Sequence, residues 1–288
     1  MKRLIIHIGT HKTGTSSFQR YCYKFRELLS EEGVCYPLIK GHENLNNHSV
    51  LAWALDKVDQ ESGSKMLNNV FSQFKDNKHH TLLISSEDLE NSLIGSDQLE
   101  KIMASARNFE FNSFEIVVVE RDPFEYLSSI YAELSKQNLI INFSDIASAA
   151  VSYGYFNAST PHFNYSFAIH TNYFVNRLSE KHPYALIRHY SLKDFVNIFP
   201  GESLLASITS EDATQIMKKA GLKKKLNNIK LDPLQVEINY ALNTIKRSKG
   251  SLGLDESQFK KIVMSIAKER LLMTNEAKQI FSPKMKTS

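Results

Sequence analysis

The sequence has few cysteines and no long apolar run. Among its 288 residues only Cys22 and Cys35 are cysteines. They form no CxxC pair, so the sequence predicts neither a disulfide framework nor a cysteine zinc site. No apolar run reaches the roughly 18 residues that a membrane-spanning helix requires. With 7 prolines and 11 glycines, the chain is also unlike low-complexity or collagen-like sequences. These absences leave an ordinary globular protein as the prediction.

Neither positive nor negative charge is in large excess. Thirty-five basic residues face 31 acidic ones, which gives a formal net charge of +4. No concentrated basic stripe accompanies this excess, so we do not expect a nucleic-acid-binding protein. A mild basic excess suits a phosphorylated or sulfated ligand. The amino terminus does not resemble a secretion signal, because a short apolar stretch gives way at once to a glycine loop. We therefore expect a cytoplasmic protein.

What is present is an alternation of short apolar runs and amphipathic, helix-length stretches. Four runs of β-branched and aliphatic residues are typical of buried parallel strands. A fifth run contains Pro37, which favours an edge strand. The strands are expected at residues 4–8, 34–39, 81–85, 114–119 and 184–188. Strands that alternate with helices predict an α/β fold, a three-layer αβα sandwich around a parallel sheet.

The last third of the chain has a different pattern. After about residue 200 the strand-like runs stop, and apolar residues recur at helical spacing near Leu234 and again near Phe259. We therefore expect one domain with two parts. Residues 1–200 would form the α/β core, and residues 201–288 a helical extension packed on it.

The strongest local signal is a glycine loop between the first strand and the first helix. Gly9 and Gly14 have the spacing of the nucleoside-triphosphate loop, but Thr15 stands where that loop has its lysine. The lysine lies earlier, at Lys12. A helix start after such a loop binds anions through its backbone N–H groups and its dipole. Lys12 would lie beside the 5′-phosphate and stabilise its charge as a leaving group.

The segment Lys12-Thr13-Gly14-Thr15-Ser16-Ser17 resembles the 5′-phosphosulfate loop of the sulfotransferase superfamily. The resemblance implies a P-loop-type fold and 3′-phosphoadenosine 5′-phosphosulfate as sulfuryl donor, without a metal. It implies that Lys12 is the catalytic lysine. It also implies that the loop binds the donor, and the expected binding residues are His11, Lys12, Thr13, Gly14, Thr15, Ser16 and Ser17.

A second motif fits the 3′-phosphate site of the same superfamily. Arg121 follows the predicted strand 114–119, and Ser129 comes eight residues later on the next helix. An arginine fork and a serine hydroxyl are suitable phosphate donors. Taken alone, Arg121-Asp122-Pro123 is more often a helix start with Asp122 as its N-cap. The later Arg-Lys-Gly loop of cytosolic sulfotransferases has only loose analogues here, at Arg247–Gly250 and Lys223–Lys225, and Arg188 is a further possible ligand.

Sulfuryl transfer also requires a group that accepts the proton of the acceptor. Glu87 is the first candidate, because it directly follows the strand 81–85 and ligand-facing groups gather at the carboxyl ends of parallel strands. Carbohydrate sulfotransferases place a glutamate in a comparable region. The alternative is that Ser85-Ser86-Glu87-Asp88 caps a helix. His48 is the second candidate, and His11 a third that could instead only shape the loop.

Aromatic residues between Tyr153 and Phe174 suit a sugar ring or an aromatic acceptor, although half or more of them are expected to pack in a helix. By resemblance to bacterial carbohydrate-type enzymes, the expected acceptor is a saccharide or glycolipid. Two alternatives remain. A P-loop small-molecule kinase would require a lysine at Thr15, and a non-catalytic binder of adenosine bisphosphate would have no need of Lys12.

Overall fold

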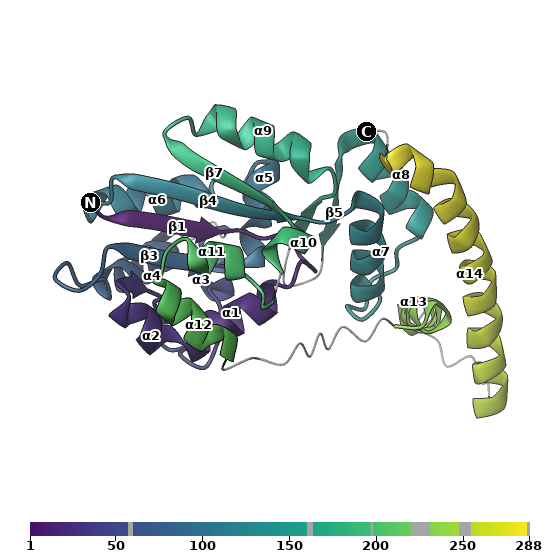
Figure 1. Cartoon of the computed structure of the whole chain (residues 1–288). Coiled ribbons are helices and arrows are strands. Elements are labelled where there is room, and N and C mark those ends of the chain that lie inside the picture. Colours follow the sequence, from purple (N-terminus) through teal and green to yellow (C-terminus); the bar gives the residue numbers. More distant parts are fainter. Residues whose placement is uncertain (57–59, 160–163, 197, 220–230, 248–254, 287–288) are drawn as a thin grey trace. The chain divides into compact units, whose positions relative to one another are not determined.

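The computed structural model describes the chain except for residues 57–59, 160–163, 197, 220–230, 248–254 and 287–288 (Figure 1). It divides into two compact units. The first unit comprises Met1–Arg121 and Thr171–Lys225, and the second comprises Asp122–His170 and Leu226–Ser288. Within the described part, no helix combines the length and apolar character needed to cross a bilayer.

The first unit is built on a five-stranded parallel sheet, as the sequence predicts. Its order is β2-β3-β1-β4-β7, and Arg3 pairs with both Thr81 and Ser113. Every carboxyl end therefore lies at the same edge of the sheet. The strands are β1 (Arg3–His7), β2 (Val34–Cys35), β3 (Thr81–Ser85), β4 (Ser113–Glu120) and β7 (Ala185–Ser191).

The central strands are buried on both faces, because alternate side chains point to opposite sides of the sheet. Ile5 and its neighbour Ile6 are both fully buried. This explains why these strands read as continuous apolar runs in the sequence. Strand β2 is shorter than expected and lies at the edge, since Pro37 has no N–H to continue the pairing.

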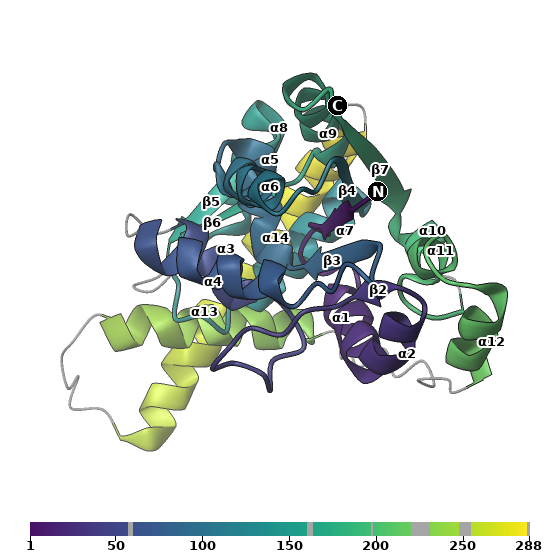
Figure 2. The same ribbon diagram turned by 90° about the vertical axis from the view of Figure 1, so that its left-hand side faces the viewer.

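Helices cover both faces of this sheet. Figure 2 shows α3 to α6 and α9 on one side. The opposite face is covered by α1, α2 and α10 to α12, whose side chains share a core with Ile5, Leu83 and Val117. The helices of this unit are α1 (Thr15–Lys24), α2 (Arg26–Glu31), α3 (Ser49–Asp56), α4 (Gln60–Ser72), the 3₁₀ helix η1 (Glu87–Glu90), α5 (Asn91–Ile94), α6 (Gln98–Asn108), α9 (Thr171–Lys181), α10 (Leu192–Phe195), α11 (Glu202–Ala206) and α12 (Glu211–Lys219).

The described residues of the second unit form four helices and a β-hairpin. The elements are α7 (Pro123–Leu134), α8 (Phe143–Tyr153), β5 (Tyr155–Ser159), β6 (Asn164–Ala168), α13 (Pro233–Arg247) and α14 (Glu256–Lys286). The hairpin corrects an expectation, because we predicted that the aromatic segment would pack largely in a helix. Phe156 pairs with Phe167 across the antiparallel strands, and both rings are buried in the core of this unit.

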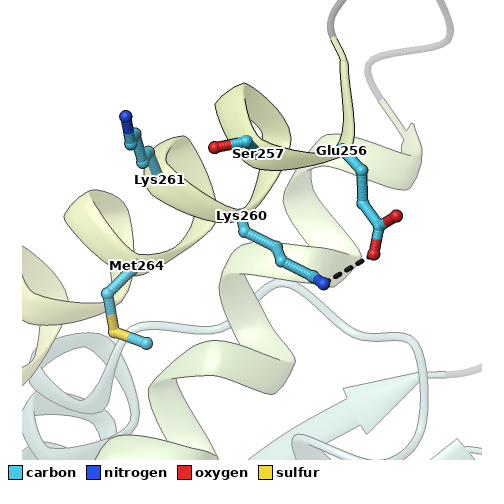
Figure 3. A pocket seen from close by; sticks show the side chains of 5 residues that line it. All are labelled: Glu256, Ser257, Lys260, Lys261 and Met264. Carbon is cyan, nitrogen blue, oxygen red and sulfur yellow. Dashed lines mark ion pairs between the residues drawn. The ribbon is translucent and has the colours of Figure 1, made fainter.

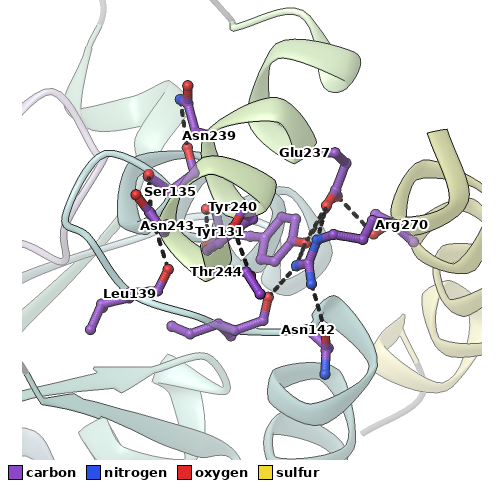
Figure 4. A network of polar contacts seen from close by, with 12 residues as sticks. Tyr131, Ser135, Leu139, Asn142, Glu237, Asn239, Tyr240, Asn243, Thr244 and Arg270 are labelled. Atoms are coloured by element: carbon purple, nitrogen blue, oxygen red, sulfur yellow. Dashed lines mark hydrogen bonds and ion pairs between the residues drawn. The ribbon is translucent and has the colours of Figure 1, made fainter. Parts of the chain in front are cut away.

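A buried polar network joins the helices of the second unit (Figure 4). Glu237 of α13 is 1% exposed. It accepts hydrogen bonds from Nε of Arg270 at 3.0 Å and from the hydroxyl of Tyr131 at 2.9 Å. The Tyr240 hydroxyl donates to the carbonyl of Tyr131 at 2.7 Å. Because removal of one partner would leave a buried group unpaired, this network fixes α13 and α14 against α7.

The boundary near residue 200 differs from our expectation. Helices α11 and α12 belong to the first unit, where Leu204, Leu205 and Met217 pack beside Phe18. The later helices α13 and α14 pack with residues 122–170 instead. Helical periodicity shows that a helix has an apolar face, but it does not specify which distant segment covers that face.

Candidate functional site

The candidate site lies at the carboxyl edge of the sheet, where the chain leaves β1 and β4 in opposite directions. Strand β1 is followed by α1 and β2 on one side, whereas β4 leads to β7 on the other. Adjacent strands whose connections diverge leave a crevice beyond their carboxyl ends, the usual ligand site of open α/β sheets. Lys12 follows β1 and Arg121 follows β4. The topology therefore brings the two predicted phosphate motifs to one place.

The loop between β1 and α1 has an unusual backbone. Gly9, Lys12 and Gly14 have φ angles of 54°, 64° and 81°. Lys12 carries a side chain, so its left-handed conformation costs about 1–2 kcal/mol. Such strain persists only where the surrounding contacts enforce it, and it concentrates at functional sites.

Hydrogen bonds to the neighbouring strand hold this loop. The hydroxyl of Thr10 donates to the carbonyl of Val119 in β4 at 2.9 Å, and the hydroxyl of Thr13 donates to the carbonyl of Thr10 at 2.5 Å. Nη1 of Arg121 donates to the carbonyl of Lys12 at 3.4 Å. Arg121 therefore contacts the loop directly, which brings together two residues that lie 109 positions apart.

Helix α1 begins beyond the loop in a form suited to an anion. Its N-cap is Gly14, no side chain caps it, and no acidic residue lies in its first turn. The positive end of the helix dipole thus meets no carboxylate from its own first turn. Ser16 is exposed, Ser17 is half-buried and Thr15 is buried.

His11 is bound to two carboxylates on η1. A single oxygen of Glu90 accepts the backbone N–H of His11 at 3.0 Å and its ring Nδ1–H at 2.8 Å. Asp88 lies 3.7 Å from the other ring nitrogen. Burial opposes protonation, but the hydrogen bonds to Asp88 and Glu90 raise the pKa of His11 to about 10. His11 is therefore a cation at neutral pH, and sequence motifs did not indicate its two carboxylate partners, Glu90 and Asp88.

Glu87 opens η1 at the carboxyl end of β3 and is half-buried. Its carboxylate accepts a 2.7 Å hydrogen bond from the amide of Gln19, a residue of α1 that is 1% exposed. The capping role belongs to Ser86, whose hydroxyl accepts the N–H of Asp88. Glu87 is thus held at the same edge of the sheet as Lys12. Gln19 was missed because a single glutamine inside a helix has no sequence signal.

His48 lies in a different environment, 1% exposed. Its Nδ1 lies 3.1 Å from both the backbone nitrogen and the carbonyl oxygen of Ser85, and its Nε2–H donates to the carbonyl of Pro37 at 3.0 Å. Burial lowers the pKa of His48 to about 4. With both ring nitrogens bound to backbone groups, His48 supports the end of β3.

The other predicted ligands are distributed differently. Ser129 is half-buried on α7 and belongs to the second unit, so its pairing with Arg121 stays a prediction. Arg188 lies in the middle of β7, where its Nε is 2.6 Å from the buried carboxylate of Glu115. It was expected at the end of that strand. Lysines 223–225 and residues 248–250 lie outside the described residues.

Two surface hollows are lined by residues other than those of the candidate site. One lies on the first turns of α14 in the second unit and includes the exposed ion pair of Glu256 with Lys260 (Figure 3). Another in the first unit is lined by Lys2, Phe74 and Phe109. The segments before β1 and β4 form it, so it lies at the amino edge of the sheet, opposite the Lys12 loop. Across the described ranges, no group of histidine, cysteine or carboxylate side chains could hold a metal ion.

Comparisons with known proteins return no relative for this chain. No family model matches it, and no significant match was found among curated proteins or solved structures.

Proposed function

We propose that this protein transfers a sulfuryl group from 3′-phosphoadenosine 5′-phosphosulfate to a hydroxyl or amine acceptor, with a saccharide hydroxyl as the first choice. The observation that carries the proposal is the Lys12 loop. It opens a helix at the carboxyl edge of the sheet between β1 and β4, and Arg121, which directly follows β4, contacts it. On this basis we assign the fold to the P-loop type.

The described residues fit a donor with two phosphate groups. The uncapped start of α1 and the hydroxyls of Ser16 and Ser17 would bind the 5′-phosphate. Lys12 would stabilise the charge on that phosphate when its bond to sulfur breaks. Arg121 would bind the 3′-phosphate with its planar fork, and Ser129 remains its proposed partner there.

Glu87 is the proposed proton acceptor. As the new bond between sulfur and the acceptor oxygen forms, the acceptor proton passes to the carboxylate, and adenosine 3′,5′-bisphosphate leaves. Gln19 orients the carboxylate through its hydrogen bond. Loose, in-line transfers of this kind depend mainly on positioning and charge stabilisation.

Glu87→Gln should lower turnover about 10²–10⁴-fold, the usual contribution of a positioned general base. Affinity for the bisphosphate product should stay the same, because Glu87 is not a phosphate ligand in this proposal. Steady-state kinetics with a saccharide acceptor, together with calorimetry, would separate the two effects. Near-wild-type turnover in Glu87→Gln would rule out this assignment.

The donor site itself is tested by titrating adenosine 3′,5′-bisphosphate into the wild type and Arg121→Ala. Loss of one charge-assisted contact is expected to weaken binding about tenfold or more. Lys78→Ala is the matched control, because it removes one exposed positive charge from the loop before β3, at the amino edge of the sheet. Its affinity should equal that of the wild type.

ATP with magnesium is the competing ligand in the same experiment. Thr15, 3% exposed, stands where a kinase loop has its lysine, so ATP should bind more weakly than the bisphosphate. A preference for ATP, or no binding of the bisphosphate by the wild type, would contradict the proposed function.

A further inference from the structure

The most unusual contact in the first unit is that between Glu90 and His11. Glu90 is fully buried, although burial of a carboxylate is costly unless strong hydrogen bonds compensate for it. One of its oxygens accepts both the backbone N–H and the ring Nδ1–H of His11, at 3.0 and 2.8 Å. The contact therefore fixes the main chain of His11 as well as its side chain.

The residue that follows is Lys12, whose left-handed backbone must be enforced by its surroundings. Contacts reach this stretch from both neighbouring strands. On the β4 side, Arg121 donates to the carbonyl of Lys12. On the β3 side, Glu90 of η1 accepts the N–H of His11. The peptide unit that precedes His11 and the one that follows Lys12 are thus anchored to the parts of the chain that follow β3 and β4.

We infer that Glu90 is a positioning residue for the phosphate loop. Its carboxylate holds the His11 amide and thereby sets the conformation in which Lys12 and the start of α1 meet an anionic ligand. The inference rests on the proposed function in one respect, that the loop binds a phosphate group. The inference gives a structural role to the negative charge of Glu90, which by electrostatics alone would repel an anionic ligand bound nearby.

This opposition between charge and geometry makes the inference testable. Glu90→Gln and Glu90→Leu each remove one negative charge, but only glutamine keeps an oxygen that can accept the His11 N–H. The Leu variant should bind adenosine 3′,5′-bisphosphate about tenfold or more weakly, the loss expected for one charge-assisted hydrogen bond. The Gln variant should stay within about threefold of the wild type, since it retains the acceptor.

Asp88→Asn is the matched control. It removes the same charge from the same 3₁₀ helix and from the same histidine, yet its oxygen lies 3.7 Å from the ring Nε2 and is not the acceptor of the His11 N–H. Its affinity for the bisphosphate should be unchanged or higher. If Glu90→Leu binds as tightly as Glu90→Gln, or more tightly than the wild type, the inference is wrong.

A second measurement requires neither a ligand nor a folded Leu variant. Hydrogen exchange of the ligand-free wild type should show the His11 amide proton protected, and Glu90→Gln should retain part of that protection. Unprotected exchange of the His11 amide in the wild type would overturn the inference. If the wild type fails to bind the bisphosphate while this proton is protected, the proposed function fails and the positioning role of Glu90 stands.

Discussion

Lys12→Gly is expected to slow sulfuryl transfer strongly while leaving the protein at least as stable as the wild type. Lys12 has φ 64°, so glycine would relieve about 1–2 kcal/mol of backbone strain. The added freedom of glycine in the unfolded chain costs about 0.5–1 kcal/mol. The net change in the free energy of unfolding should therefore lie between zero and a gain of ~1.5 kcal/mol.

Turnover of the phosphosulfate donor should fall about 10²–10³-fold in the same variant, because the leaving phosphate loses a preorganised cation. Lys12→Ala is the control: it loses the charge equally but keeps the strain. Urea denaturation and donor turnover of both variants measure the two effects. A destabilisation of Lys12→Gly by more than ~1 kcal/mol would contradict the strained backbone, and retained turnover would contradict the catalytic role.

Gly9→Ala should have the opposite profile, with a large loss of stability. Gly9 has φ 54°, and an added Cβ would lie 2.3 Å from the Cγ2 of Thr15 and 3.3 Å from the ring of His7. Both neighbours are buried, so neither can move away cheaply. Backbone strain and overpacking together should lower the free energy of unfolding by about 2–4 kcal/mol.

Gly41→Ala separates the two causes. Gly41 has φ 82°, but no heavy atom lies within 4 Å of an added Cβ, so only the backbone term of about 1 kcal/mol should appear. Urea midpoints of the two variants give the comparison. Equal destabilisation would mean that the close approach of Gly9 to Thr15 does not exist in solution. Bisphosphate binding should weaken in Gly9→Ala alone.

The strands were the most predictable part of the fold. Four aliphatic runs predicted β1, β3, β4 and β7, and Pro37 indicated that β2 lies at an edge. The inner strands β1, β3 and β4 are buried on both faces, so their sequence signal is a continuous apolar run. The expectation of a buried strand was wrong for β7, which lies at the other edge of the sheet and leaves Leu186 exposed. Lys12 and Arg121 each come shortly after one of these runs, so the sequence also predicted that both residues lie just beyond the end of a strand.

Other features depend on contacts between distant residues, and short-range patterns do not encode them. The aromatic segment forms a hairpin whose strands pair Phe156 with Phe167, although its spacing also suited a helix. Helices α13 and α14 pack on residues 122–170 through the network of Glu237 and Arg270. An apolar helix face can be buried against any complementary surface, so its pattern does not specify the partner.

The sequence by itself determined a parallel α/β sheet, a glycine loop that carries Lys12 at a helix start, and an arginine at the end of a buried strand. These follow from local periodicity and from backbone requirements of single residues. Only the tertiary structure decided which groups support the loop. Gln19 meets Glu87 across 68 positions, and Glu90 meets His11 across 79. Buried polar groups require partners, but the choice of partner is made by the packing of the whole unit.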